Sequence, residues 1–356
     1  MNSFGNLFRI STFGESHGKA IGGIVDGCPS NLVVDYDLIQ QQLALRQKDP
    51  LDINQRKELD NVEFVSGIMH GKTTGAPIAF FIQNKDTKSE DYTQESTVLK
   101  PSHGHFSYWK KYNIYDYRGG GRASARETAC RVVCGCFAMM FLKQYNIHIE
   151  AFTTQIGHVK LKNHFCSYDS AEAQKNALHC PDNATAQEML AFLSEIAVSK
   201  DSIGCVIGCL ISNVPAGLGE PVFDKLSANL AKAMLSIPAA KGFEYGSGFL
   251  SASKRGSEIN DLFTHDFHTK TNYSGGIQAG ISNGNPVYFS VPFKPIPSIM
   301  QEQPSIDLDG NPCVLKAAGR HDVCVSPRVV PVVEAMAAIT IVDHLLYYNA
   351  YKTNKF

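Results

Sequence analysis

Glycine and arginine are concentrated in residues 116–128, which read Asp-Tyr-Arg-Gly-Gly-Gly-Arg-Ala-Ser-Ala-Arg-Glu-Thr. Three consecutive glycines allow backbone N–H groups to approach a ligand without interference from Cβ atoms. Ser124 and Glu127 have the spacing of a capping box, so the loop should lead into a helix N-terminus, which favours a bound anion. The stretch also supplies guanidinium groups, which suit phosphate and carboxylate, from Arg118, Arg122 and Arg126. The pattern predicts an anion site, and a flexible turn with solvated arginines is the alternative that this stretch leaves open.

Histidines stand at two other places where they could transfer protons. His17 lies in the polar turn 13–18, and His103 and His105 follow Lys100 shortly before the glycine loop. Histidine titrates near neutral pH, so a histidine beside an anion site is a candidate acid or base. A solvated hairpin histidine is the other interpretation of His17.

Composition limits the classes of partner. The 356 residues carry a formal net charge of −1, so no overall basic field attracts nucleic acid or an acidic membrane surface. No apolar run approaches the ~20 residues that span a bilayer, and residues 1–10 lack a signal-like apolar region. We therefore expect a cytoplasmic protein. The ten cysteines include no two Cys-x-x-Cys pairs at zinc spacing, so we expect reduced, buried thiols and no metal site.

The elements that must position these residues alternate along the whole chain. Apolar periodicity predicts helices over 35–46, from 129 onward, and over 184–197, 223–234 and 327–341. Strands are expected within 4–25, 62–65, 78–82, 203–214 and 287–291, with polar loops at 47–60 and 86–107 that could cover a site. The glycine-rich segment 274–284 precedes a strand rather than a helix, which excludes a Rossmann nucleotide site. With no repeat or linker, we predict one α+β domain, 1–356.

Several separated stretches together resemble the chorismate synthase family. They are Phe-Gly-Glu-Ser-His-Gly at 13–18, the glycine loop at 117–128, Gly-Arg-His-Asp at 319–322 with Pro327-Arg328 and 334–336, and the segments 215–225 and 236–244. The resemblance runs nearly end to end. It implies a β-α-β sandwich of two antiparallel sheets with surrounding helices, and a homotetramer.

The same resemblance implies a reaction. Phosphate is lost by 1,4-elimination from 5-enolpyruvylshikimate 3-phosphate to give chorismate, the last common step of the shikimate pathway to aromatic amino acids. Reduced FMN is required although no net oxidation occurs. Because substrate and FMN are both anionic, a neutral protein must gather cations locally.

Roles for individual residues also follow from the resemblance. His17 would protonate or stabilise the reduced flavin, His103 would supply a proton to the departing phosphate, and Asp322 would assist removal of the ring hydrogen. The substrate anions would be bound by Arg46, Lys100 and Arg126. The flavin would be lined by Arg122, Ala123, Ser124, Pro238, Ala239, Ala279, Lys294, Pro295, Ile296, Pro297, Ser298 and Arg320.

The chain departs from the family pattern at a few positions. Leu45 and Leu51 stand where arginines are usual, which weakens the case that this protein also binds NADPH and reduces its own flavin. NADPH as the reductant is the alternative that the sequence leaves open. Lys100 and Tyr115 also replace arginines, His105 replaces an aspartate, and Ile296 and Pro297 are atypical. These changes motivate a second hypothesis, a flavin-dependent reductase or other phosphate lyase with a changed substrate. A third, binding of RNA or another polyanion, is disfavoured by the net charge.

Overall fold

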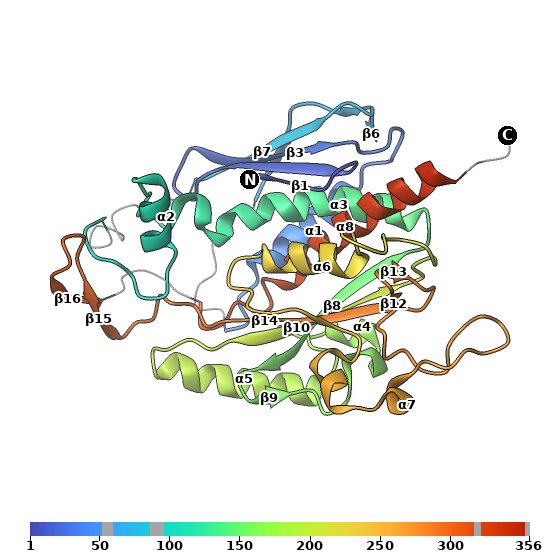
Figure 1. Ribbon diagram of the computed structural model, residues 1–356. Helices are drawn as coiled ribbons and strands as arrows, with labels where there is room; N and C mark the ends of the chain where they lie inside the picture. Colours follow the sequence, from blue (N-terminus) through green and yellow to red (C-terminus); the bar gives the residue numbers. More distant parts are fainter. Residues whose placement is uncertain (52–59, 86–95, 317–321, 353–356) are drawn as a thin grey trace.

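A computed structural model describes residues 1–51, 60–85, 96–316 and 322–352, and arranges them as two antiparallel sheets with helices between them (Figure 1). The first sheet has the strand order β1-β2-β3-β7-β4. Its strands are β1 (Ser3–Phe4), β2 (Arg9–Gly14), β3 (Ala20–Asp26), β7 (Ile78–Gln83) and β4 (Val62–Phe64). Buried and partly buried residues alternate along β7, as expected for a sheet with one face on the core.

The second sheet has the order β11-β14-β10-β8-β9. Its strands are β11 (Glu244–Tyr245), β14 (Val287–Phe293), β10 (Cys205–Ser212), β8 (His148–Ile156) and β9 (Val159–Lys160). The helix α5 (Asn183–Val198) lies on the side of this sheet away from the central helices (Figure 1).

Four helices form the central layer, namely α1 (Tyr36–Gln47), α3 (Thr128–Lys143), α6 (Leu226–Leu235) and α8 (Val330–Tyr351). The crossing of α3 and α8 is close, because a Cβ added to Gly135 would lie 2.3 Å from the Cβ of Ala335. Both helices are apolar nearly all round, which is the pattern of helices covered on every side. The apolar core therefore runs from one sheet through the helices to the other.

The remaining elements are short. They are α2 (His105–Tyr112), α4 (Ser170–Ala173), α7 (Gly256–Ile259), and the strand pairs β5 (Ile68–Met69) with β6 (Lys72–Thr73), β12 (Ile277–Gln278) with β13 (Ile281–Ser282), and β15 (Glu302–Ile306) with β16 (Pro312–Lys316).

The predicted fold class is confirmed, with local differences. Part of the stretch 86–107, expected to be a loop, begins α2, and the central strand β8 was not anticipated. The helix after the glycine loop starts at Thr128 and is preceded by two 3₁₀ turns, Gly121–Ala123 and Ala125–Glu127. All ten cysteines are free, and all but Cys166 and Cys313 are buried.

Within the described part of the chain, one helix is long and apolar enough to cross a membrane, whereas no such run is expected from the sequence. The helix is α8, and 89% of its most apolar 18-residue stretch is buried inside the protein. Burial on this scale is typical of the core helix of a globular fold, and α8 fills that position between the sheets (Figure 1).

Candidate active site

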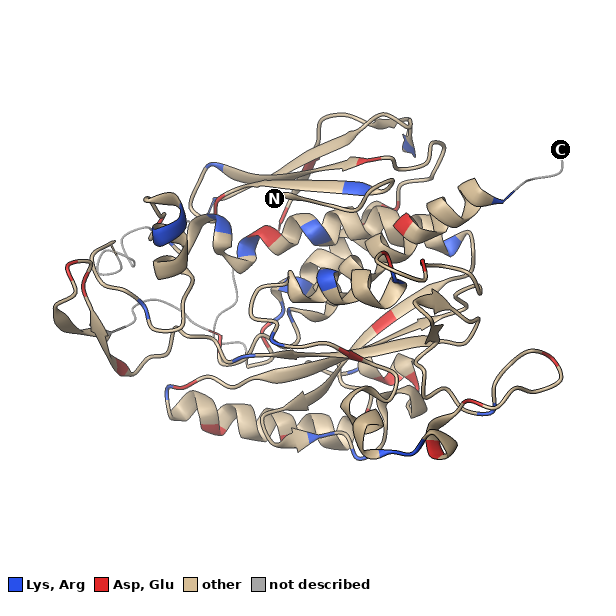
Figure 2. Cartoon of the chain, viewed as in Figure 1, with Lys and Arg blue, Asp and Glu red and all other residues tan. Residues whose placement is uncertain are grey.

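A cavity of about 410 Å³ opens at the N-terminal start of α3. Its wall combines the end of α1, the loop at 102–104, the glycine loop, the turn at 237–239, the segment 294–298 and the start of the chain leading into α8. Most of the predicted site residues line it: Arg46, His103, Ala123, Ser124, Arg126, Pro238, Ala239, Lys294, Ile296, Pro297, Ser298 and Asp322. Basic residues gather near the start of α3 (Figure 2).

The glycine loop packs directly against His17. All three glycines have positive φ, 61° at Gly119, 83° at Gly120 and 53° at Gly121. A Cβ on Gly119 would lie 2.5 Å from Cε1 of His17, so glycine is required there for both conformation and space. His17 stands behind this backbone and does not line the cavity, and its Nδ1 lies 3.0 Å from Oγ of Ser16. The Ser16 hydroxyl also donates toward the backbone oxygens of the loop.

The predicted capping box is half formed. Oγ of Ser124 accepts from the N–H of Arg126 at 3.4 Å. The carboxylate of Glu127 instead forms an ion pair with Arg131, at 2.7 Å. Arg131 also donates to the backbone oxygen of Ser236 at 3.1 Å, just before the turn 237–239. The helix start and that turn are thereby held together.

Two arginines are fixed around one buried carboxylate. Nη1 of Arg126 lies 2.5 Å from Oδ1 of Asp60, and Nη1 of Arg46 lies 3.7 Å from its Oδ2. Arg46 also donates to the backbone oxygen of Ala125 at 2.9 Å and to Oγ1 of Thr128 at 3.0 Å. Guanidinium groups held in place before a ligand arrives lose little entropy on binding it. The trio has one net positive charge, which favours an anion in the cavity.

His103 is held as a neutral imidazole. Burial, followed by the nearby His105, Lys100 and Lys294, lowers the pKa of His103 to about 3. Its Nδ1 is buried and has no hydrogen-bond partner within the described part of the chain. Burial and Lys100 likewise lower the pKa of His105, to about 4, while Asp116 opposes that shift.

Some predicted site residues lie elsewhere. Nη2 of Arg122 donates to the backbone oxygen and Oγ1 of Thr12, at 2.7 and 2.6 Å, so its guanidinium faces β2. Lys100 is buried behind the cavity wall and donates to Oγ of Ser298 at 3.0 Å. Pro295 is next to cavity residues but does not line the cavity. Arg320 lies outside the described residues.

Ala279 is distant from the cavity within one chain. Its neighbour Gly280 accepts a hydrogen bond from the N–H of Leu226, the first residue of α6, at 2.8 Å. The cavity turn follows Leu235, the last residue of that helix. Ten helical residues span roughly 15 Å, so Ala279 lies near the opposite end of α6.

Several cavity residues were not predicted as site residues. Arg328 stood in one of the matching stretches but was given no role, and its Nη1 lies 2.9 Å from Oδ2 of Asp322. Its Nε donates to the backbone oxygen of Lys48 at 3.2 Å. The other unpredicted lining residues include Gln47, Ser102, Thr128, Val325, Val329 and Val332. The valines carry no sequence signal that separates them from ordinary core residues.

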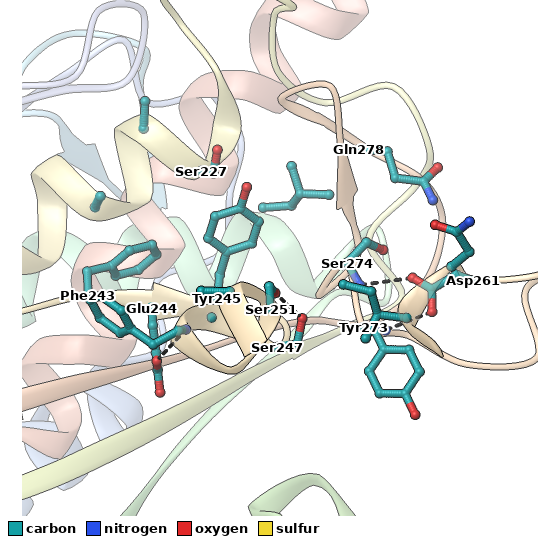
Figure 3. A pocket seen from close by; sticks show the side chains of 18 residues that line it. Ser227, Phe243, Glu244, Tyr245, Ser247, Ser251, Asp261, Tyr273, Ser274 and Gln278 are labelled. Carbon is teal, nitrogen blue, oxygen red and sulfur yellow. Dashed lines mark hydrogen bonds between the residues drawn. The ribbon is translucent and has the colours of Figure 1, made fainter. Parts of the chain in front are cut away.

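A larger cavity lies elsewhere among the described residues, an open groove of about 870 Å³ beside α6 (Figure 3). Its lining includes Phe243, Tyr245, Tyr273 and Ser274, and its charged side chains are Glu244 and Asp261. A groove whose charged groups are both carboxylates does not suit a phosphate, so we assign the site to the cationic cavity.

The cationic cavity fits a flavin phosphate. One part of its wall is made of small or apolar side chains, including Ala123, Pro238 and Ala239, against which a flat ring can pack. The opposing groups are cations, among them Lys294, whose Nζ lies 2.7 Å from the backbone oxygen of Ser102. The orphaned Nδ1 of His103 is a polar atom that a ligand could satisfy.

The fold and the cavity define an enzyme that acts on an anionic small molecule. A family model described as chorismate synthase matches residues 8–346. A chorismate synthase of Christiangramia forsetii is 52% identical over 355 residues, covering 99% of both chains, and one of Parabacteroides distasonis is 51% identical over 97% of this chain and 98% of its own. A crystal structure of a chorismate synthase, 30% identical, matches with a TM-score of 0.77 over 97% of this chain and 93% of its own. The chain belongs to the chorismate synthase family, lyases of the shikimate pathway.

Proposed function

We propose that this chain converts 5-enolpyruvylshikimate 3-phosphate to chorismate and phosphate by 1,4-elimination in the cavity at the start of α3. The observation that carries the assignment to this cavity is the convergence of Arg46, Arg126 and Lys294 on a wall that also presents His103 and Asp322. A substrate with one phosphate and two carboxylates requires several cations around groups able to move protons.

The cofactor of the proposed reaction is reduced FMN. When bound, it supplies electron density that the departing phosphate requires. The small residues Ala123, Ser124, Pro238 and Ala239 would pack against its ring, and Lys294 would hold its phosphate. Where Ala279 takes part, it must reach the flavin from another copy of the chain, because it lies at the far end of α6.

The substrate is bound by charge that is already in place. Arg46 and Arg126 face the cavity from two sides of Asp60 and would bind substrate anions. Lys100 would act through Ser298, whose hydroxyl stands between the buried ammonium and the cavity.

The proton-handling groups surround the same space. His103 would give a proton to the phosphate oxygen as the C–O bond breaks, and Asp322, oriented by Arg328, would assist removal of the ring hydrogen. His17 would act on the flavin from behind the glycine loop, held by Ser16. Enclosure of these groups by the surrounding apolar side chains excludes water and strengthens each interaction.

Anaerobic turnover tests the proposal. Purified protein with chemically reduced FMN and 5-enolpyruvylshikimate 3-phosphate should release chorismate and phosphate in equal amounts. His17→Ala, His103→Ala and Asp322→Ala should each lose at least about 100-fold in kcat, the usual scale for general acid–base groups, whereas His70→Asn, at an exposed turn, should not. Binding of reduced FMN without chorismate would favour the changed-substrate hypothesis instead.

The source of reducing equivalents is proposed to be external. Leu45 and Leu51 pack against the core and provide no cation for a nicotinamide phosphate. Oxidised FMN plus NADPH should therefore yield no chorismate, whereas chemically reduced FMN should. Formation of chorismate from oxidised FMN and NADPH, with no other reductant present, would contradict the proposal of an external reductant.

We propose assembly into a homotetramer, with the open groove beside α6 as one contact face. The groove lining includes an exposed aromatic residue, Phe249, at 84% exposure. Apolar surface of this kind typically marks an interface. Phe249→Asp should lower the mass measured by light scattering, while Val198→Asp, on the exposed end of α5 (85% exposed), should not.

A further inference from the structure

His103 lies among three basic side chains from different segments of the chain. Its ring centroid is 4.1 Å from that of His105 on α2, in an edge-to-face arrangement. Lys294 binds the backbone oxygen of the adjacent Ser102 at 2.7 Å, and Lys100 donates to Ser298 in the cavity wall. The ionisable groups that act on His103 are thus basic and come from the loop, from α2 and from the segment after β14.

The nearby carboxylates are already engaged by arginines. Asp60 is bound between Arg46 and Arg126, and Asp322 lies 2.9 Å from Arg328. Asp116, beyond His105, pairs with Arg118 at 2.9 Å. None of these carboxylates is among the groups that shift the pKa of His103. Within the described residues, the negative charge that would stabilise an imidazolium at this position is therefore missing.

This arrangement conflicts with a proton donor that is charged before the substrate arrives. Burial and three basic neighbours lower the pKa of His103 to about 3, so the ring is neutral at pH 7. A neutral imidazole is a poor acid. The proton must reach His103 at a later stage.

We infer that His103 binds a proton from solvent when the phosphate-bearing substrate enters the cavity, so that the anion itself charges its own proton donor. The inference rests on the proposed function. The proton moves from water to the imidazole on binding, and from the imidazole to a phosphate oxygen as the C–O bond breaks. The ring is then neutral again.

The electrostatics allow a change of this size. One opposite charge within 4–6 Å raises an imidazole pKa by roughly 1 to 3, and a phosphate dianion carries two charges. Starting from about 3, two such contributions bring His103 into the neutral range. In the enzyme without substrate, the basic cluster keeps the imidazole of His103 neutral. The site therefore attracts an anion without an additional buried charge on His103.

Calorimetric titration measures the proton directly. The holoprotein with oxidised FMN, which cannot turn over, is titrated with 5-enolpyruvylshikimate 3-phosphate at pH 7.5 in three buffers of different ionisation enthalpy. A phosphate ester with a second pKa near 6 is almost fully dianionic there, so the ligand contributes little. We expect net proton uptake, which is a fraction of a proton per site when the pKa of His103 in the complex lies near 7 and approaches one proton when that pKa exceeds the working pH.

Variants assign the proton to its residue. His103→Asn should abolish most of the uptake, and His105→Asn should leave most of it, because His105 lines the neighbouring cavity rather than this one. His70→Asn should behave as wild type. Binding heat in wild type that is independent of the buffer, or uptake that persists in His103→Asn, would overturn the inference. Wild type alone decides the first of these, even where a variant does not fold. Absence of any saturable binding would overturn the proposed function as well, and is distinguishable from both.

Discussion

Arg328 contacts Asp322 through its Nη1 and is held in turn by the backbone oxygen of Lys48. The guanidinium therefore fixes the carboxylate that is proposed to help remove the ring hydrogen. Both side chains are about one quarter exposed, so the pair is only partly screened by solvent. Its value lies in orientation rather than in stability.

Arg328→Gln should lower kcat/KM by about 10- to 100-fold, because a charge-assisted hydrogen bond is worth roughly 1.5–3 kcal/mol. Steady-state kinetics with chemically reduced FMN measures the loss. The double variant with Asp322→Asn should lose little more than Asp322→Asn alone, since Arg328 acts through that carboxylate. Multiplicative losses would show that Arg328 has a separate role.

At the scale of elements, the glycine loop is the part that joins the first sheet to the site. Ser16 and His17, in the turn just after β2, leave no space for a side chain on Gly119, because the His17 ring lies where a Cβ atom would be. The loop then turns through two 3₁₀ segments into α3. His17 and the cavity wall are thus positioned by a single close contact between a turn and a loop.

Gly119→Ala should lower turnover at least about tenfold, because a Cβ there would displace His17 or the loop. Gly71→Ala is the matched control, since Gly71 has a similar φ of 73° but nothing within 4 Å of an added Cβ. Both variants should lose roughly 1 kcal/mol of stability from backbone strain. Equal activity in the two variants would mean that the contact with His17 is unimportant.

At the scale of the whole molecule, α8 connects both sheets. Asp343 accepts backbone N–H groups from Asn6, Leu7 and Phe8, which lead into β2, at 2.7–3.1 Å. Nine residues toward the N-terminus of α8, Glu334 accepts the N–H of Ala151 in β8 at 2.9 Å. We propose on this basis that the chain folds as one domain.

Asp343→Ala should destabilise the protein by about 2 kcal/mol, because the buried N–H of Phe8 and the partly buried N–H groups of Asn6 and Leu7 lose a charged acceptor. Urea unfolding followed by circular dichroism and by Trp109 fluorescence, at matched protein concentration, measures the loss. Coincident transitions from the two probes are expected for one domain. Two separated transitions would indicate that the sheets unfold independently.

Glu334 gives the molecule a pH-dependent stability. Burial raises the pKa of Glu334 to about 7, so between pH ~4.5 and 7 the folded state binds more protons than the unfolded state, and stability falls as pH rises. Glu334→Gln keeps an acceptor for Ala151 and removes the charge. Relative to wild type, it should gain stability from pH 5 to pH 8, by up to about 3 kcal/mol. An equal difference at both pH values would contradict this.

The sequence by itself determined the reactive groups and most of the scaffold. Local patterns were sufficient for the helix after the glycine loop, for α1 and for the buried strand β10, because capping and apolar periodicity act over a few residues. The motifs at His17, at the glycine loop and at Asp322 identified the family, because each motif is a short run of neighbouring residues that can be recognised without the fold.

Only the tertiary structure decided where side chains of the right type point. Arg122 lies two residues before Ser124 in sequence, yet its guanidinium is bound by Thr12 of β2. Lys100 is buried and donates to Oγ of Ser298, nearly two hundred residues away in the chain. The orientation of these side chains depends on partners that are distant in sequence, and local periodicity does not predict which residues those partners are. The protonation state of His103 has the same origin, because burial and three converging basic groups set it.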